Sequence, residues 1–261
     1  MNSHIASALL GIVQGLTEFL PISSTGHLIL FEKVLDFEGP PGKTFEVVVQ
    51  LGSALAVICA YFERLLRPVQ RFSSSRDDRR FVFILFLATI PAAIAGFLFH
   101  NFVKECLYNA VTVASSLIIG GLIFLWIEHR KRAVKCLRPE AATTWQASCI
   151  GAAQALALVP GVSRSGATIA SGVLVGMSRR AATEFSFLLA VPTLMGAGIY
   201  DLFFHRQLLT ADHLSFLSIG FFTAFFSSLL VFRPLVNCID RFGFTPFAWY
   251  RIGLGLLVLL I

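Results

Sequence analysis

The sequence has little charge for its length. Of its 261 residues only 14% are Asp, Glu, Lys or Arg, whereas a soluble globular chain carries about 25%. A chain with so few charged groups lacks the polar surface of a water-soluble domain, and its 56% hydrophobic content excludes intrinsic disorder. The composition therefore favours a bundle of membrane helices.

Patterned cysteine is also lacking. The chain has five Cys, an odd number, and none forms a C-x-x-C pair, so we expect neither a disulfide framework nor a zinc site. Residues 1–8 contain no Lys or Arg, and no small-residue cleavage site follows the first apolar stretch. We therefore expect no cleavable signal peptide.

Long apolar runs are what the sequence does contain. A helix needs about 20 mostly apolar residues to cross the hydrocarbon core of a bilayer. Six runs reach or approach that length and are predicted to span the membrane: 45–62, 81–100, 111–127, 184–204, 214–232 and 245–261.

Two further apolar regions are broken in the middle. Residues 5–34 are interrupted at 21–26, and residues 145–177 are interrupted at 160–166, in both cases by Pro, Gly and Ser. Each half is too short to span, and unpaired backbone is tolerated at membrane depth only inside protein or beside a polar cavity. We therefore predict two re-entrant helical hairpins.

The two broken regions resemble each other. Residues 11–14 (GIVQ) correspond to 151–154 (GAAQ), the two turns correspond with one inserted residue in the second, and three predicted spans follow each hairpin. The predicted fold is an all-α integral membrane protein with an inverted repeat of two units, each a re-entrant hairpin plus three transmembrane helices. The single membrane domain, 1–261, divides into a first repeat (1–139) and a second, inverted repeat (140–261).

Basic residues predict the orientation. Under this topology fifteen of the 21 Lys and Arg residues fall on one side, which the positive-inside rule makes cytoplasmic. They are Arg64, Arg67, Arg71, Arg76, Arg79, Arg80, Arg130, Lys131, Arg132, Lys135, Arg138, Arg179, Arg180, Arg233 and Arg241, against Lys33, Lys43, Lys104 and Arg206 on the other side. The net charge of +6 is thus a topology signal, and we expect no nucleic acid as a partner.

Polar side chains gather at the two breaks. Gln14 and Glu18 are four residues apart and share a helix face, and the turn after them carries Ser23, Ser24, Thr25, Gly26 and His27. The second turn carries Ser163, Arg164, Ser165, Gly166 and Thr168.

Each turn leads into a half-helix whose N-terminal N–H groups and dipole favour an anion, and an Arg side chain suits paired phosphate oxygens. A carboxylate, an imidazole and hydroxyl groups beside such a site are the groups that phosphoryl transfer to water requires. Taken singly, Glu18 and His27 are also compatible with packing roles, and Arg251 is expected to snorkel or to pair with a neighbour.

Residues 14–27 (QGLTEFLPISSTGH) and 160–168 (PGVSRSGAT) resemble the two signature motifs of the bacterial undecaprenyl-diphosphate phosphatase family of the bacitracin-resistance type. The similarity extends through 43–46 and 184–192. The resemblance implies a multi-pass enzyme of the bacterial plasma (inner) membrane that hydrolyses undecaprenyl diphosphate to undecaprenyl phosphate and phosphate. This reaction recycles the lipid carrier for peptidoglycan synthesis and confers bacitracin resistance.

The family's first motif begins with Glu or Gln, and this chain has Gln14, so Glu18 is the only carboxylate of the motif. The resemblance also implies a divalent cation, Mg²⁺ or Ca²⁺, with Glu18 as a ligand. We expect Glu18, Ser24, His27 and Arg164 to be catalytic, with Ser24 either a nucleophile or a donor that orients phosphate. Substrate binding is assigned to Gln14, Ser23, Thr25, Gly26, Ser163, Ser165, Gly166 and Thr168.

Two alternatives to the phosphatase interpretation stay open at this point. Inverted repeats and broken helices are also typical of secondary transporters, so the chain is alternatively a flippase of a phosphorylated polyprenyl lipid. A structural or assembly subunit is a third interpretation.

The expected partners are undecaprenyl diphosphate and membrane lipid, and a homodimer is a further prediction.

Overall fold

The structure is a computed structural model and describes residues 3–40, 43–130, 133–205 and 211–260. These residues are almost entirely helical and contain no strand, only an isolated bridge between Cys136 and Met177. The all-α prediction is confirmed. The α-helices are α1 (Ser3–Thr17), α2 (Ser24–Leu35), α3 (Thr44–Ala60), α4 (Phe62–Gln70), α5 (Arg76–Phe102), α6 (Ala110–Glu128), α7 (Thr144–Leu156), α8 (Arg164–Leu174), α9 (Arg179–His205), α10 (Ala211–Phe242) and α11 (Thr245–Leu260).

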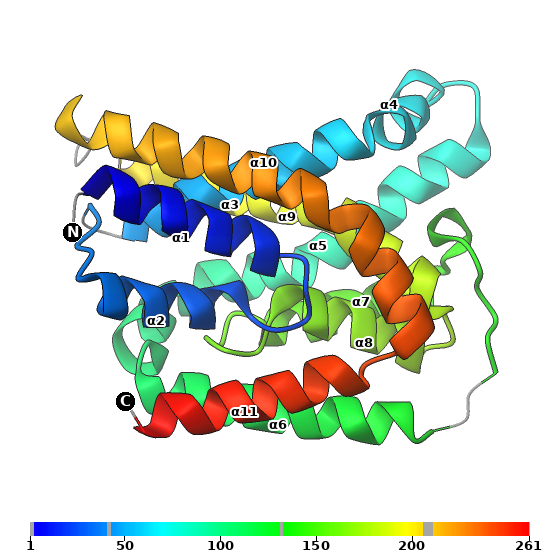
Figure 1. The fold of residues 1–261 in the computed structure, drawn as a ribbon. Coiled ribbons are helices and arrows are strands. Elements are labelled where there is room, and N and C mark those ends of the chain that lie inside the picture. The colour runs from blue at the N-terminus through cyan, green and yellow to red at the C-terminus, as the bar shows by residue number, and fades with distance from the viewer. Residues whose placement is uncertain (1–2, 41–42, 131–132, 206–210, 261) are drawn as a thin grey trace.

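Four of these helices form the two predicted hairpins. In Figure 1, α1 runs from the left end of the molecule to its middle and α2 returns to the left, whereas α7 and α8 enter from the right end and return there. The four helices have only 15, 12, 13 and 11 residues, too few to span a bilayer. Both turns therefore lie inside the bundle.

Among the described residues, four helical segments are long and apolar enough to cross a membrane: Arg76–Phe99, Ala110–Glu128, Arg179–Phe204 and His213–Phe242. A fifth is possible only if α3 and α4, which meet at a bend of 72°, count as one broken span. The chain is thus a multi-pass membrane protein by helix length and composition.

Of the six predicted spans, four are thus supported by length and composition, and a fifth is supported together with α4. The run 245–261 forms α11, a shorter apolar helix of 16 residues, and residue 261 lies outside the described residues. At 1.5 Å per residue such a helix is about 24 Å long, less than the roughly 30 Å of the hydrocarbon core. The run 45–62 likewise reaches spanning length only together with α4.

Ion pairs connect several of the segments that carry basic residues at one end of the molecule. Arg64 of α4 binds Glu140 (3.0 Å), which lies between α6 and α7, and Glu184 (2.7 Å) of α9. These segments lie at the right end of Figure 1. Lys43, at the opposite end, binds Glu46 (2.9 Å). Of the basic residues used to predict orientation, Lys131, Arg132 and Arg206 lie outside the described residues.

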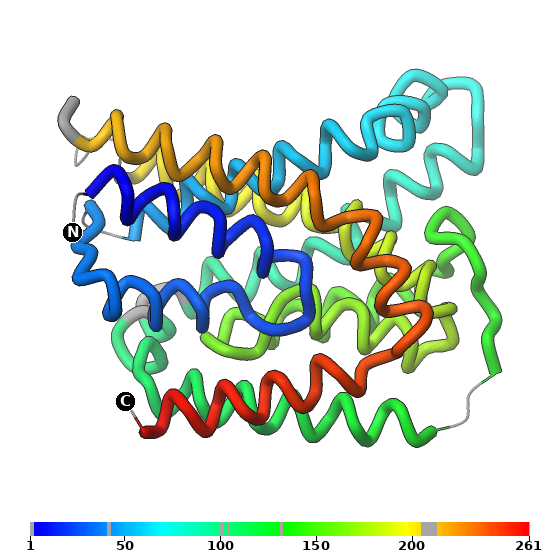
Figure 2. The backbone as a smooth tube through the Cα atoms, in the orientation of Figure 1, coloured from blue at the N-terminus to red at the C-terminus, as the bar shows by residue number. Residues whose placement is uncertain are grey.

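The hairpins are held by close helix packing. Helix α1 lies against α10 and α7 against α5, as the tube in Figure 2 also shows for α1 and α10. A Cβ on Gly11 would overlap the carbonyl oxygen of Gly220, and a Cβ on Gly151 would lie 2.6 Å from that of Ala88. Glycine at both positions therefore allows a backbone-to-backbone approach that larger residues would prevent.

Candidate functional site

The two turns share one local conformation. Ser23 and Ser163 precede α2 and α8 with φ of 71° and 72°, and the Oγ of each accepts a hydrogen bond from the N–H of Gly26 (3.3 Å) or Gly166 (3.0 Å). Positive φ is costly for a residue other than Gly and is often found at functional sites.

The spacing of these residues corrects the sequence comparison. Ser23 and Ser163 are separated by 140 residues, the same separation that relates Gln14 to Gln154 in the preceding helices. The predicted insertion in the second turn is therefore wrong. It came from matching Pro21 with Pro160, whereas the structural counterparts are the two capping serines.

Glu18 joins the two hairpins. Its carboxylate is only 6% exposed, and Oε2 accepts hydrogen bonds from Gln14 Nε2 (2.9 Å) and Ser24 Oγ (2.7 Å). Its Oε1 accepts from Nε (3.3 Å) and Nη2 (3.1 Å) of Arg164 in the second hairpin. Residues 146 positions apart in the chain thus meet in one buried cluster, and Gln14, Glu18, Ser24 and Arg164 are brought together as the motifs led us to expect.

Aromatic side chains pack beside the Arg164 guanidinium. Arg164 Nη1 donates to the carbonyl oxygen of Ser186 (3.2 Å), and its guanidinium lies 5.8 Å from the centre of the Phe19 ring. The Phe19 ring packs against Phe187 (5.4 Å) and Phe232 (4.8 Å). These rings form an apolar surface against which the Arg164 guanidinium lies.

His27 is held at both ring nitrogens. Nδ1 lies 2.7 Å from the carbonyl oxygen of Ser23, which can only accept, so Nδ1 carries a proton. Nε2 lies 2.6 Å from the hydroxyl of Tyr250 in α11, and the two rings are parallel within 3°. In the neutral imidazole Nε2 therefore accepts the Tyr250 proton. Sequence reasoning missed Tyr250, whose signal was a hydroxyl-bearing residue beside Arg251 in an apolar run.

The remaining polar residues of the second turn bind protein groups. Ser165 Oγ donates to the carbonyl oxygen of Leu20 (2.8 Å) and lies 3.2 Å from Ser163 Oγ. Thr168 Oγ1 donates to the Arg164 carbonyl oxygen (2.9 Å) and lies 2.7 Å from Ser186 Oγ. In this state these hydroxyls connect segments of the fold rather than point into open space.

The residues that follow Ser24 lie in the first turn of α2. Thr25 is half-buried there, and Gly26 is buried against Val113, which a Cβ on Gly26 would contact at 3.4 Å. Gly166 is buried in the same way, with Phe124 3.1 Å from the Cβ position. Both glycines let the turns pack closely against α6.

Arg251 is the largest departure from expectation at the site. The side chain is fully buried, so of the two predicted alternatives it does not snorkel but pairs with neighbouring groups. Its guanidinium donates instead to five backbone carbonyl oxygens, those of Pro21 (3.2 Å), Gly161 (3.0 Å), Val162 (3.0 Å), Ser116 (3.1 Å) and Leu117 (3.4 Å).

One atom of the cluster is left without a partner. Gln14 is fully buried, and while its Nε2 donates to Glu18, its Oε1 has no hydrogen-bond partner. A buried amide oxygen costs free energy unless it accepts a hydrogen bond or binds a cation.

The part of the chain that the structure describes contains no group of three or more His, Cys, Asp or Glu that could hold a metal ion. A cation here would therefore depend on few protein oxygens.

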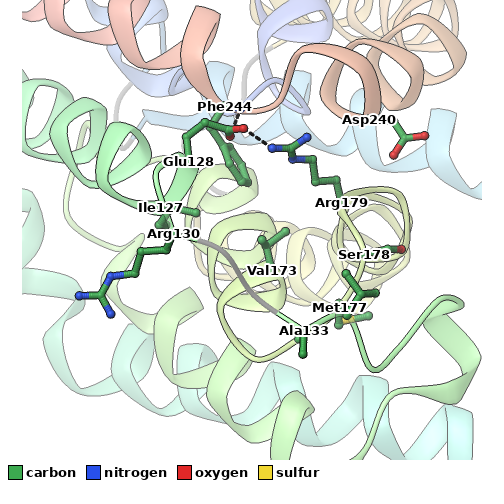
Figure 3. A pocket seen from close by; sticks show the side chains of 12 residues that line it. Ile127, Glu128, Arg130, Ala133, Val173, Met177, Ser178, Arg179, Asp240 and Phe244 are labelled. Atoms are coloured by element: carbon green, nitrogen blue, oxygen red, sulfur yellow. Dashed lines mark hydrogen bonds and ion pairs between the residues drawn. The ribbon is translucent and has the colours of Figure 1, made fainter.

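A separate cavity of about 310 Å³ lies at the basic end of the molecule. It is lined by residues from the ends of α6, α8 and α10 and the start of α9, and Figure 3 shows the ion pair between Glu128 and Arg179 across it. The Phe244 N–H also donates to Glu128 (2.9 Å). None of the predicted site residues lines this cavity, so it is distinct from the cluster at the turns.

Comparison with known proteins agrees with the motifs. The undecaprenyl-diphosphatase of Nitrosospira multiformis is 49% identical over 252 residues, which are 97% of this chain and 92% of that protein. Undecaprenyl-diphosphatase 3 of Acinetobacter baylyi is 47% identical over 253 residues, 97% of this chain and 95% of that protein. The undecaprenyl-diphosphatase of Methylococcus capsulatus is 49% identical over 251 residues, 96% of this chain and 92% of that protein.

The matched relatives and this chain correspond over nearly their whole lengths, so the similarity includes both hairpins and the helices around them. The family model for the bacitracin resistance protein BacA matches residues 7–257, which contain every residue of the cluster. The chain belongs to the bacitracin resistance protein BacA family.

Proposed function

We infer that this chain is an undecaprenyl-diphosphatase, a hydrolase that converts undecaprenyl diphosphate to undecaprenyl phosphate and phosphate. The observation that carries this inference is the buried contact of Glu18 with both Ser24 and Arg164. It unites a carboxylate, a hydroxyl and a guanidinium from the two family motifs in one place, and the relatives compared above are named for this reaction.

Diphosphate binding is assigned to Arg164 and to the N-termini of α2 and α8. Arg164 has five N–H donors, more than its contacts with Glu18 and Ser186 use among the described residues. The two helix N-termini add backbone N–H groups and a favourable dipole for an anion. Further substrate contacts are assigned to Gln14, Ser23, Thr25, Gly26, Ser163, Ser165, Gly166 and Thr168.

Two mechanisms are compatible with the hydrogen bond from Ser24 to Glu18. In the first, Glu18 takes the Ser24 proton while Oγ attacks the terminal phosphorus, the bond from that phosphorus to the bridging oxygen breaks, and undecaprenyl phosphate leaves. Water then hydrolyses the serine phosphate and releases phosphate. In the second, Glu18 acts on the attacking water and Ser24 only orients the phosphate. His27 transfers protons in both. Labelled phosphate trapped on Ser24 favours the first mechanism, and turnover that survives in Ser24→Ala rejects it.

The donor set also fits a divalent cation, Mg²⁺ or Ca²⁺. Glu18 supplies a carboxylate, and the unpartnered Oε1 of Gln14 supplies a buried neutral oxygen one helical turn away. Hard cations prefer oxygen ligands, and Mg²⁺ is often held by one or two protein oxygens together with substrate phosphates. Glu18 and Gln14 would hold such an ion, which would supply positive charge to neutralise phosphate oxygens.

The proposal also includes the location of the protein, its orientation in the membrane and the relation between its two halves. The bacterial plasma (inner) membrane is the location, and the end that carries Arg64 and Arg180 is cytoplasmic by the positive-inside rule. The two units, 1–139 and 140–261, are related as an inverted repeat, which the matched positive-φ serines and the paired hairpin contacts support.

Lipid tails contact the exposed apolar side chains of the long helices. A homodimer stays a prediction that the particle mass in detergent tests.

The reaction would regenerate the monophosphate carrier for peptidoglycan synthesis, and removal of the diphosphate would confer bacitracin resistance. Phosphate release from undecaprenyl diphosphate by purified protein in detergent, with and without EDTA, tests the activity. We expect metal-dependent release that is lost in Glu18→Ala, His27→Ala and Arg164→Ala but kept in Tyr200→Phe, an exposed control on α9. Absence of release from a folded wild-type protein that still binds the lipid would favour a flippase instead.

A further inference from the structure

Arg251 connects both hairpin turns to a third element of the fold. It lies in α11, and its guanidinium binds the carbonyl oxygen of Pro21 in the first turn and those of Gly161 and Val162 in the second. These backbone positions lie one or two residues before the capping serines: Pro21 is two residues before Ser23, and Val162 directly precedes Ser163. Contacts with α6 complete the set.

We propose that Arg251 is a positioning residue for phosphoryl transfer, which sets the separation of the two hairpin turns. The proposal rests on the function inferred above, because the turns carry the residues assigned to the reaction. Ser24 and Arg164 each follow directly on a capping serine, so a shift of either turn would move one reacting group relative to the other.

The chemistry of the side chain supports a specific role. A buried charge is expensive, and no carboxylate pairs with Arg251 in the described part of the chain. Its planar fork presents N–H groups in several directions, whereas the ammonium group of Lys is a single point charge. Only Arg therefore reaches carbonyl oxygens of both turns and α6 at once.

A glycine on α6 leaves space for the Arg251 guanidinium. A Cβ on Gly120 of α6 would overlap Nη2 of Arg251, so only Gly leaves space for the guanidinium at this point. The Phe124 ring lies 5.2 Å from the guanidinium carbon on the same helix. Gly120 thus offers a way to displace Arg251 without replacing it.

Other contacts between the turns do not replace this one. Ser165 donates to the Leu20 carbonyl oxygen, and Arg164 binds Glu18, but both contacts run directly from one turn to the other. Arg251 fixes both turns against α6 and α11. Loss of this shared anchor would let each turn shift relative to α6 and α11, and the separation of the two turns would change with it.

The test compares kcat and KM for undecaprenyl diphosphate in detergent, with Tm as a measure of folding. A misplacement of about 1 Å costs about 100-fold in rate. We therefore expect Arg251→Lys and Gly120→Ala each to lower kcat about 100-fold while KM changes less than about 3-fold, because charge is kept and ground-state binding is less sensitive to position. The double variant should be no worse than Arg251→Lys alone.

Gly253→Ala is the matched control. It lies two residues from Arg251 on the same helix, and a Cβ there meets nothing within 4 Å, so we expect wild-type kcat, KM and Tm. If Arg251→Lys does not fold, Gly120→Ala carries the test by itself. Wild-type kcat in Arg251→Lys or Gly120→Ala, a lowered Tm with unchanged kcat, or multiplicative losses in the double variant would overturn the positioning role. A wild-type protein without release would instead reject the proposed function, and the role of Arg251 with it.

Discussion

Tyr250 donates a hydrogen bond to His27 Nε2 at 2.6 Å, while the carbonyl oxygen of Ser23 holds the Nδ1 proton of the same ring. These two contacts select one tautomer of His27 and set the plane of its ring. Tyr250 is 47% exposed on α11, whereas His27 is buried. His27 is thus prepared to exchange a proton through Nε2 with Tyr250 as its neighbour.

Removal of the Tyr250 hydroxyl should slow the reaction through His27. Tyr250→Phe keeps the parallel ring contact and loses a hydrogen bond worth about 1 kcal/mol, which corresponds to about fivefold in kcat. In a His27→Ala background the same substitution should have no further effect, because its partner is gone. Steady-state kinetics on the four proteins measure this coupling, and equal losses in the two backgrounds would show that Tyr250 acts elsewhere.

The cation requirement should depend on the unpartnered amide oxygen of Gln14. Gln14→Leu removes that oxygen, and we expect the Mg²⁺ concentration for half-maximal phosphate release to rise about 10-fold. Gln154→Leu is the matched control, because Gln154 lies 140 residues later and its amide already binds Ala88 and Thr193. A Mg²⁺ titration after EDTA treatment separates the two variants. Equal Mg²⁺ requirements in both would argue against Gln14 as a ligand.

Acid pH should stabilise the end of the molecule opposite the basic loops. Burial, and then repulsion from Glu46, raises the pKa of the Glu32 carboxyl from 4.5 to about 7, against the attraction of Lys43. Between these pH values the unfolded chain releases a proton that the folded chain keeps, so stability falls as pH rises through this window and levels off above it.

The thermal unfolding temperature in detergent, followed from pH 4.5 to pH 8, measures this dependence on pH. Glu32→Gln cannot ionise, so its unfolding temperature should fall less across the window. Glu38→Gln changes an exposed carboxyl in the connection between α2 and α3 and serves as the control. If Glu32→Gln and wild type lose the same number of degrees, another group is responsible.

The orientation in the membrane gives a prediction that does not depend on catalysis. A reporter inserted after Ser74, beside Arg71, should be cytoplasmic, and one inserted after Glu38 should be outside, because the two segments lie at opposite ends of the molecule (Figure 1). Enzymatic reporters that are active on only one side of the membrane give the readout. A Ser74 reporter found outside would reverse the proposed orientation.

The hairpins could be predicted because Pro, Gly and Ser are clustered at both breaks, and such clusters between apolar segments are typical of turns. Single prolines such as Pro91 and Pro192 lie inside long helices instead. Glu18 and Arg164 could be assigned to one site because they lie at corresponding breaks, but their direct contact is seen only in the structure. Arg251 and Tyr250 could not be assigned in this way, because they lie inside an apolar run and their partners are backbone carbonyls and a His more than 200 residues away in the chain.

The failed predictions have physical causes as well. Apolar composition does not show that the described helix in the last apolar run has only 16 residues, or that the chain bends by 72° between α3 and α4. Matching the prolines of the two turns placed an insertion where the capping serines show none, because backbone conformation, not proline, relates the two turns.

If the two hairpin turns form one phosphatase site, Glu18 and Arg164 depend on each other, and a double-mutant cycle measures that dependence. Phosphate release from undecaprenyl diphosphate is measured for wild type, Glu18→Gln, Arg164→Lys and the double variant. We expect metal-dependent release by wild type, a loss of about 100-fold or more in each single variant, and little further loss in the double variant. No release by wild type, or a double-variant loss equal to the product of the single losses, would contradict the claim.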